Sequence, residues 1–550
     1  MLRSGHRAAL LGLSLALAFS VAVGAHAHAA AEIGPTAGGA GGRGRILLVL
    51  PFDNLTGQPS LEWMREAAAN LLSSRFTSAG FAPMSRADRV YALDHLGLPQ
   101  GFHPSRASSL KLAETLDADS IIVGSYKTDG GEIVAEAQVV DVPRLRMSQA
   151  VTTRGQMRAM TSVFDSLAWK LTRQMDPGFS VAEETFVAAG SGLRLDAFEQ
   201  YIRGITESDQ AERLRHLNAA VKLSPEFSPA WMALGREQFA SQQYEQAAEA
   251  FSKVDHNGAD ALEAGFYRGL SLLFSGDYAR AEEAFGGVAR VLPLAEVLNN
   301  QGVALARQSK NGVPLFRQAA AADPNGADYH FNLAVSLKRR GNNAEALVEM
   351  AQCLRLHPND SEAQTLQKAW KASATASAAA LEAGADEETG TRVDALERIE
   401  RGFDAVAFRQ AAFMMDQMNE ARLAALPPRE RARKLSARAK DYLDRGLLLE
   451  AERLYQAAEA AAPKAAEAHA GLAEVRERTG DAEAARKEAH MALGLEPSAD
   501  AFLVLARLDF AAGHLDEAGK EAGKALELAP ASKAAHELRQ QIEAKRAQKN

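Results

Sequence analysis

The chain has 550 residues, a formal net charge of −8 at pH 7 and one cysteine. This length is too great for one hydrophobic core, so several structural units are expected. An acidic balance without a basic stripe argues against a nucleic-acid-binding protein, because neutralising phosphates requires clustered lysine and arginine. A single cysteine excludes an internal disulfide.

Residues 1–29 have the composition of a secretory signal peptide. Arg3 and Arg7 precede an apolar run from Ala8 to Gly24, and small residues follow up to Ala29. A basic head, an apolar middle and an A-x-A end are typical of a cleaved export signal. An uncleaved anchor is the alternative, since the run is close to the shortest membrane span. We expect the mature protein to be periplasmic, either free in the periplasm or attached to the surface of a membrane.

Residues 30–44 are predicted to form a Gly-rich linker. The run Gly38-Gly39-Ala40-Gly41-Gly42 is not followed by Gly-Lys-Ser/Thr, and it precedes the first strand instead of following one. A phosphate-binding loop needs both features. Nucleotide binding is therefore not expected here.

Residues 45–178 are predicted to form a small α/β domain. The apolar run from Ile46 to Phe52 indicates a buried strand that ends in a turn. Further strands are expected over 81–84, 120–126 and 132–142, and helices over 61–76, 88–96, 105–116 and 162–175. A hairpin turn at Asp129-Gly130-Gly131 joins the last two strands. Interleaved strands and helices are typical of a layered α/β domain.

Three stretches of this domain carry a family resemblance: Leu50-Pro51-Phe52-Asp53-Asn54, the helical Leu61-Glu62-Trp63, and Ala118-Asp119-Ser120-Ile121-Ile122-Val123-Gly124-Ser125-Tyr126. Together they resemble the TolB amino-terminal-like domain. The resemblance implies an interaction or assembly module of the bacterial envelope and brings no catalytic residues. The β-propeller of TolB is not suggested by the sequence that follows.

Asp53 lies at the carboxyl end of the first predicted strand, where ligands bind in open α/β sheets. Turn chemistry alone explains both Asp53 and Asn54, and we favour that interpretation. The alternative is a ligand-sensing or regulatory envelope protein whose α/β domain binds a small molecule. That function would need a pocket of polar groups around Asp53, Asn54 and Ser125.

A helical pattern recurs about every 34 residues across two blocks, 194–370 and 432–550. Each unit has a small residue in its first helix, a turn that usually contains glycine, and alanine with an apolar residue in its second helix. A proline closes most units, and Pro463, Pro497 and Pro530 lie 34 and 33 residues apart. This pattern resembles the tetratricopeptide repeat and predicts eight helix hairpins in an all-α solenoid, a right-handed superhelix closed by a capping helix over 534–549.

The third unit is degenerate, and the segment between the blocks has a different pattern. Gly302 and Phe316 are kept, but their spacing predicts a turn about two residues shorter. A linker or mobile helix is expected over 371–391 and a helical connector over 392–428. Phenylalanine and methionine recur in the connector, which indicates core packing or, alternatively, a partner-binding face. They are Phe403, Phe408, Phe413, Met414, Met415 and Met418.

First-helix residues that point away from the second helix are the candidates for a peptide-binding groove. They are Phe239, Phe266, Phe274, Asn300, Phe331, Asn332, Lys338 and Arg339. In some tetratricopeptide proteins an asparagine equivalent to Asn300 and Asn332 grips the backbone or carboxylate of a peptide. Glu296 and Asp328 stand where a carboxylate clamp would have lysine, so a solvated groove remains the leading alternative. Lys338 and Arg339 would suit an acidic ligand.

No motif for catalysis or metal binding is present. The sequence has no H-E-x-x-H, C-x-x-C or G-x-S-x-G, and its 13 histidines are dispersed. Cys353 falls at a small-residue position of a second helix, so we expect it to be buried and inert. The sequence thus predicts a non-catalytic envelope scaffold that binds proteins or peptides without a cofactor. A self-associating structural component is a further alternative.

Overall fold

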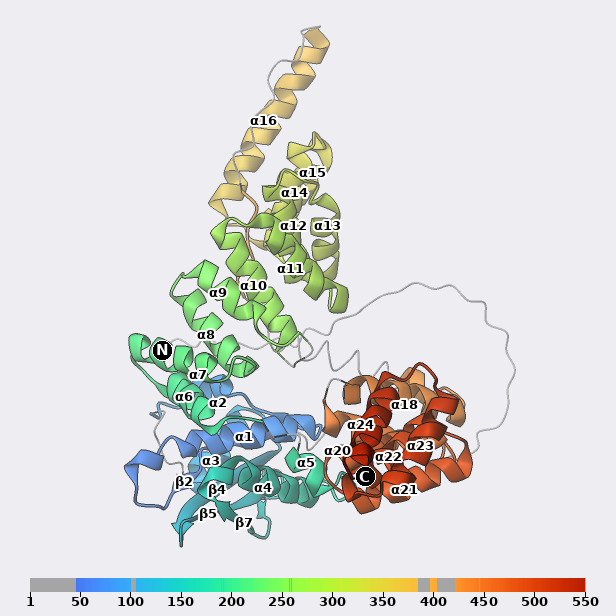
Figure 1. Ribbon diagram of the computed structural model, residues 1–550. Helices are drawn as coiled ribbons and strands as arrows, with labels where there is room; N and C mark the ends of the chain where they lie inside the picture. Colours follow the sequence, from blue (N-terminus) through green and yellow to red (C-terminus); the bar gives the residue numbers. More distant parts are fainter. Residues whose placement is uncertain are drawn as a thin grey trace, which may run out of the picture. The chain divides into compact units, whose positions relative to one another are not determined.

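The computed structural model describes residues 46–99, 105–188, 190, 192–256, 258, 260–383, 396–402, 421–444 and 446–549. A small α/β domain is followed by a long series of helix hairpins (Figure 1). The predicted fold class, an α/β domain followed by an all-α solenoid, is confirmed. The predicted export signal and the glycine linker lie outside the described residues.

The α/β domain contains a mixed sheet of seven strands in the described residues. Their bounds are β1 Ile46–Val49, β2 Asp53–Asn54, β3 Ala82–Pro83, β4 Ser120–Asp129, β5 Glu132–Asp141, β6 Arg146–Met147 and β7 Val151–Gln156. The main path is β3-β1-β4-β5-β6, while β2 pairs with β4 and β7 pairs with β5. β1 is parallel to β3 and β4, and β4 and β5 form the predicted antiparallel hairpin. Gly130 and Gly131 make its turn with φ values of 59° and 87°, which favour glycine.

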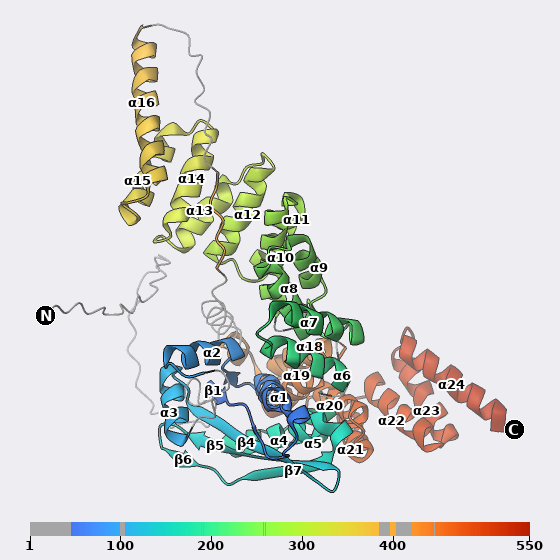
Figure 2. The same ribbon diagram turned by 90° about the vertical axis from the view of Figure 1, so that its left-hand side faces the viewer.

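Helices cover both faces of this sheet. They are α1 Met64–Ser78, α2 Arg86–His95, α3 Arg106–Thr115, α4 Met160–Met175 and the short α5 Glu183–Ala188, with 3-10 turns at Pro59–Leu61 and Met157–Ala159. Successive strand residues point to opposite faces. Leu47 and Val49 therefore pack against α1 and α4, whereas Leu48 and Leu50 pack against α2 and α3. These helices are labelled in Figure 2.

Strand β7 was not predicted from the sequence. Its polar composition hides a short alternation in which Val151 and Thr153 are buried. The Thr153 hydroxyl donates a hydrogen bond of 3.0 Å to the carbonyl of Val163, so this buried polar group is satisfied.

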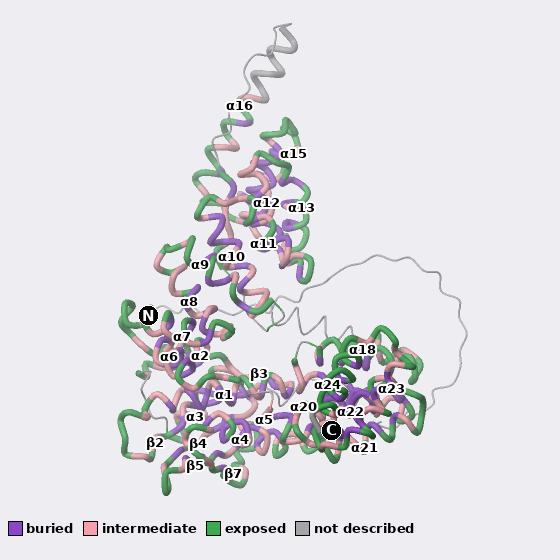
Figure 3. The backbone as a smooth tube through the Cα atoms, in the orientation of Figure 1, coloured by how far each residue is buried: buried purple, intermediate pink, exposed green. Residues whose placement is uncertain are grey.

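All eight predicted hairpins are present in the described residues. In the first block they are α6 Leu195–Thr206 with α7 Gln210–Leu223, α8 Ser228–Ala240 with α9 Tyr244–Ser252, α10 Ala261–Ser275 with α11 Tyr278–Val291, α12 Ala295–Arg307 with α13 Val313–Ala322, and α14 Ala327–Arg339 with α15 Asn343–Leu356. In the second they are α18 Pro428–Asp444 with α19 Leu448–Ala461, α20 Ala466–Arg478 with α21 Ala482–Leu495, and α22 Ala499–Ala512 with α23 Leu515–Leu528, before the capping helix α24 Lys533–Lys549. Buried and exposed residues alternate along these helices (Figure 3).

Small first-helix residues let the two helices of a hairpin approach closely. In three hairpins this residue is a glycine that faces phenylalanine, and a Cβ atom there would lie 2.7–2.8 Å from the phenylalanine ring of the second helix. The three pairs are Gly235 with Phe251, Gly269 with Phe285, and Gly302 with Phe316. The recurring small residue is therefore a packing requirement.

The predicted short turn in the third unit is wrong. Residues 308–312 separate α12 from α13, whereas residues 276–277 alone separate α10 from α11. The shortening occurs in the second helix, because α13 has 10 residues and α11 has 14. The longer turn places Ser309 at a φ of 58°, while Gly276 has a φ of 84°.

The region between the blocks differs from the predicted linker and connector. Helix α16, Ser361–Ala383, continues through the first part of the predicted linker. Residues 396–402 form neither helix nor strand, so the prediction of a helical connector over 392–428 is wrong there. The phenylalanine and methionine residues from 403 to 418 lie outside the described residues.

A recurring side-chain bond links consecutive hairpins. The side chain six residues after a closing proline donates to that proline's carbonyl, as Trp231 does to Pro225 at 2.7 Å and His330 does to Pro324 at 3.2 Å. The Nδ1 atom of His330 lies 2.7 Å from a carboxylate oxygen of Glu349, and this hydrogen bond raises the pKa of the histidine. Protonation of His330 therefore stabilises the fold below its unfolded-state pKa of about 6.5, and this contribution is lost as the pH rises through the folded value.

Across the described part of the chain, no helix is both long enough and apolar enough to cross a membrane.

The glycine packing predicts opposite effects for two alanine substitutions in one hairpin. Gly269→Ala should lower the free energy of unfolding by about 1–2 kcal/mol, because overpacking against Phe285 outweighs the better helix propensity of alanine. Gly287→Ala in α11 should raise it by about 0.5–1 kcal/mol, since the new Cβ would meet only Arg290 at 3.8 Å. Urea unfolding followed by circular dichroism measures both. Stabilisation by Gly269→Ala would contradict the packing account.

Candidate functional site

Residues 396–402 lie against the first helices α10, α12 and α14 of the first block. We call the surface that they contact the first-helix face and the residues Leu396–Gly402 the internal segment. The segment runs beside these helices (Figure 2), and its contacts reach residues up to 100 positions away in sequence.

Two asparagines hold the backbone of the internal segment. Asn300 Nδ2 donates to the carbonyl of Glu400 at 2.7 Å, and the N–H of Glu400 donates back to Asn300 Oδ1 at 2.9 Å. Asn332 makes the same pair of bonds with Arg398, at 2.7 and 2.6 Å. Each amide thus pairs with both backbone groups of one residue. Because the two residues held are two positions apart and face the same way, the segment is extended.

A third asparagine connects these two contacts. Asn299 Nδ2 donates to the carbonyl of Arg398 at 3.1 Å, while its Oδ1 accepts a bond of 2.7 Å from Asn332 Nδ2. All three asparagine residues are fully buried. A buried amide without partners is costly, so the internal segment supplies hydrogen bonds that this face needs.

The Arg398 side chain occupies an acidic pocket. Its guanidinium donates to Asp360 at 2.6 and 3.1 Å, to Asp328 at 2.7 Å and to Glu362 at 2.9 Å. It also lies 3.6 Å from the ring centroid of Phe331, a close cation–π contact. The hydrogen bond from Arg398 lowers the pKa of Asp360. The ion pair is therefore kept above the ordinary aspartate pKa and is lost only as the pH falls through the lowered value.

The neighbouring Glu397 occupies a basic pocket. Its side chain is fully buried and pairs with the guanidinium of Arg339. Arg307 lies 3.9 Å from the second carboxylate oxygen and donates to the Glu397 carbonyl at 3.2 Å. Two cations therefore lie around the buried charge, as buried charge requires, while Oε2 of Glu397 accepts no hydrogen bond from the described residues.

An apolar residue and a second arginine complete the contact. Ile399 packs against the core of the first block. The guanidinium of Arg401 lies 5.0 Å from the ring centroid of Phe274. That ring belongs to an aromatic cluster with Phe239 and Tyr244, at centroid distances of 6.0 and 5.0 Å.

The predicted groove residues divide into two groups. Contacts with the internal segment are made by Phe274, Asn300, Phe331, Asn332 and Arg339. The other three lie elsewhere: Phe239 in the aromatic cluster, Phe266 fully buried 5.8 Å from Phe285 in its own hairpin, and Lys338 bonded to Asn343 at 2.7 Å.

Sequence reasoning missed part of this site. It did not include Asn299, Arg307, Asp360, Glu362 or the internal segment. Asp328 could have indicated a cation-binding pocket from the sequence, because an acid stands where a carboxylate clamp would have lysine. That exchange inverts the preference of the pocket from a carboxylate to a cation.

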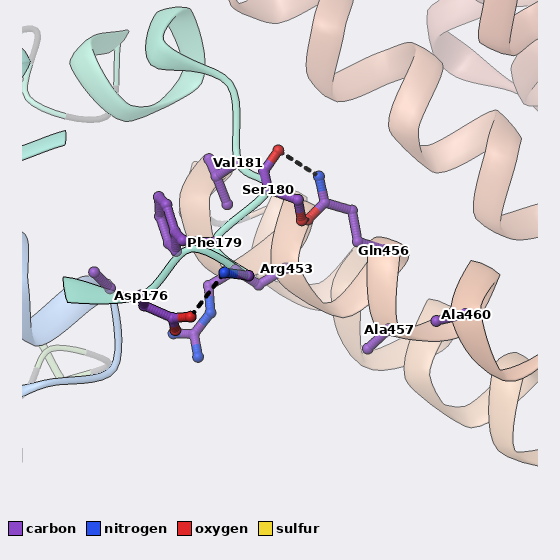
Figure 4. Close-up of a pocket in the computed structure, with 10 residues that line it drawn as sticks. Asp176, Phe179, Ser180, Val181, Arg453, Gln456, Ala457 and Ala460 are labelled. Carbon is purple, nitrogen blue, oxygen red and sulfur yellow. Dashed lines mark hydrogen bonds between the residues drawn. The ribbon is translucent and has the colours of Figure 1, made fainter. Parts of the chain in front are cut away.

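The α/β domain shows turn chemistry at the alternative site. Asn54 Oδ1 accepts bonds from the Thr56 N–H at 3.0 Å and the Thr56 hydroxyl at 2.6 Å. This bonding is the turn role expected of Asn54. Two open hollows on the described surface lie elsewhere, one beside Gln242 and one between residues 176–181 and α19. In the latter, Ser180 and Gln456 hydrogen-bond to each other (Figure 4).

Cys353 is fully buried, and burial raises the pKa of its thiol to about 11. A thiol with a raised pKa is a poor nucleophile. No group of three or more histidine, cysteine, aspartate or glutamate side chains in the described ranges is placed to hold a metal ion.

Comparison with known families supports the repeat assignment. The family model described as "Tetratricopeptide repeat" matches residues 267–312, 309–361 and 436–500. These matches cover α12 and α14, which carry the three asparagines. Together with the hairpins, they support tetratricopeptide-type repeats over these parts of the chain. No curated protein matches the chain.

Several solved structures are similar to parts of the chain. YrrB, described as "a TPR protein with an unusual peptide-binding site", is 18% identical with a TM-score of 0.30, over 32% of this chain and 92% of YrrB. MamA from Desulfovibrio magneticus RS-1 is 19% identical with a TM-score of 0.28, over 31% and 99%. The LpoB C-terminal domain from Salmonella enterica is 19% identical with a TM-score of 0.18, over 21% and 84%.

The asparagine bonds predict that the internal segment is protected from trypsin. Cleavage after Arg398 should be at least about 10-fold faster in Asn300→Ala/Asn332→Ala, because each lost buried hydrogen bond costs about 1–3 kcal/mol. Asn342→Ala is the matched control, since the Asn342 side chain makes no capping hydrogen bond. Mass spectrometry of early digests gives the rates. Equal rates in all three proteins would show that the asparagines do not hold the segment.

Proposed function

We propose that this chain is a non-catalytic scaffold that binds extended segments of partner proteins on its first-helix face. The observation that carries the proposal is the paired hydrogen bonding of Asn300 and Asn332 to a peptide backbone. Backbone groups are common to all peptides, so this mode of holding a chain is transferable to a partner.

The aromatic cluster supports the proposal. Phe239, Tyr244, Tyr267 and Phe274 lie together beyond the contact with Arg401. Aromatic side chains provide much contact area at a low cost in conformational entropy, and they are enriched where proteins bind each other. A partner segment that continues past the asparagines would meet this cluster.

We further propose that the protein acts in the bacterial cell envelope. The support is the signal-peptide pattern of residues 1–29 and the resemblance of the α/β domain to the TolB amino-terminal-like domain. In this account the α/β domain associates with envelope components while the hairpins bind partners.

Site-specific photo-crosslinking in cells tests both parts. p-Benzoylphenylalanine replacing Phe239 should give covalent adducts with another protein, recovered from the periplasmic fraction on a chain that lacks the leader. The same residue replacing Val348 is the control, because Val348 is 66% exposed on a second helix. Adducts from both positions alike, or none from Phe239, would contradict a partner segment that continues from the first-helix face onto the aromatic cluster. An uncleaved cytoplasmic chain would contradict export.

A further inference from the structure

Two pockets of opposite charge lie side by side on the first-helix face. Arg307 and Arg339 surround Glu397, whereas Asp328, Asp360 and Glu362 surround Arg398. Each pocket holds more charge than its occupant neutralises. Like charges within each pocket would therefore be left facing one another without an occupant.

The asparagines bind the backbone of a bound chain, whereas the two pockets bind its side chains. The asparagine bonds go to backbone groups and accept any sequence, while the pockets bind side chains. Consecutive residues of an extended chain point to opposite sides, so an acid and a base in adjacent positions reach separate pockets. The contact therefore distinguishes the order of the two residues.

We propose that the first-helix face selects an extended peptide with glutamate directly followed by arginine, and that the internal segment is a resident competitor that a partner must displace. This inference rests on the proposed peptide-binding function and specifies its ligand.

Charge repulsion gives the selectivity. In the reversed order, an arginine would face Arg307 and Arg339, and a glutamate would face Asp328 and its acidic neighbours. Burying a charge against like charges is strongly disfavoured, which is a common basis for rejecting wrong partners. The effect is large here because the Glu397 side chain has no exposure to solvent.

Covalent attachment makes the internal segment an effective competitor. A tethered segment acts at an effective concentration in the millimolar range when its linker allows binding. A separate peptide with the same contacts must exceed that concentration to displace half of the segment. Disabling the segment should therefore increase the apparent affinity for such a peptide.

Fluorescence anisotropy with a labelled, end-capped peptide of residues 396–402 tests the proposal on the full chain. Its control is the peptide Leu-Arg-Glu-Ile-Arg-Glu-Gly, which has the same composition and net charge but in which no glutamate is directly followed by arginine. Three proteins are compared. They are the wild type, the double variant Glu397→Ala/Arg398→Ala, and a quadruple variant that also carries Asn300→Ala and Asn332→Ala. We expect the Glu397→Ala/Arg398→Ala protein to bind the first peptide at least 10-fold more tightly than the wild type does. The reversed peptide and the added asparagine changes should each weaken binding at least 10-fold.

Other results would overturn either the resident competitor or the order selectivity. Equal affinity of the wild type and the Glu397→Ala/Arg398→Ala protein would exclude a resident competitor, and equal affinity for both peptides would exclude order selectivity. If circular dichroism shows that Glu397→Ala/Arg398→Ala is unfolded, Arg398→Gln replaces it. Unfolding of that variant too would make the segment an integral part of the fold and overturn its displacement. A wild-type dimer that Arg398→Gln converts to monomer would place the segment on a second copy, contradicting competition within one chain.

Failure of this inference is distinguishable from failure of the proposed function. Crosslinks from Phe239 without selective peptide binding would leave partner binding intact and reject the glutamate-arginine ligand. Selective peptide binding without crosslinks would establish the ligand chemistry and reject a cellular partner that reaches the aromatic cluster.

Discussion

Buried side-chain amides must form hydrogen bonds, and this constraint determines how the first block is completed. Asn299, Asn300 and Asn332 are fully buried on helices whose own backbone bonds are already made. Their partners are the backbone groups of Arg398 and Glu400. An apolar face would have needed no such partner. In this structure the three asparagines and the extended segment satisfy one another's hydrogen-bonding groups.

The charged residues around the asparagines determine the register in which the chain is bound. The pocket for Glu397 is basic and the adjoining pocket for Arg398 is acidic, so the bound chain is fixed in register as well as in place. Electrostatic complementarity contributes to specificity more than to affinity. The hairpins supply the platform, and in three of them glycine against phenylalanine brings the two helices close together.

Local patterns were enough to predict the architecture. The helix hairpins follow from small residues, turns and prolines that recur at a fixed period, and the hairpin of β4 and β5 follows from Gly130 and Gly131. The same period placed Asn300 and Asn332 at equivalent positions and so identified the central residues of the site. Strand β7 was missed because only two of its residues show the alternation.

The occupant of the site could not be predicted in this way. Glu397, Arg398, Glu400 and Arg401 are good helix formers, and their order resembles a solvated helix. Bonds to residues 66 and 100 positions away override that local preference. The shortening of α13 could not be predicted either, since the spacing of Gly302 and Phe316 does not say whether the turn or the helix has lost residues.

Amide hydrogen exchange of Arg398 and Glu400 in the wild-type protein tests the central claim most directly. Both amides donate to asparagine side chains, at 2.6 and 2.9 Å. The account predicts exchange at least about 10-fold slower than in the free peptide of residues 396–402, since a hydrogen-bonded amide must open before it exchanges. Exchange at the rate of the free peptide would show that the first-helix face does not hold the internal segment.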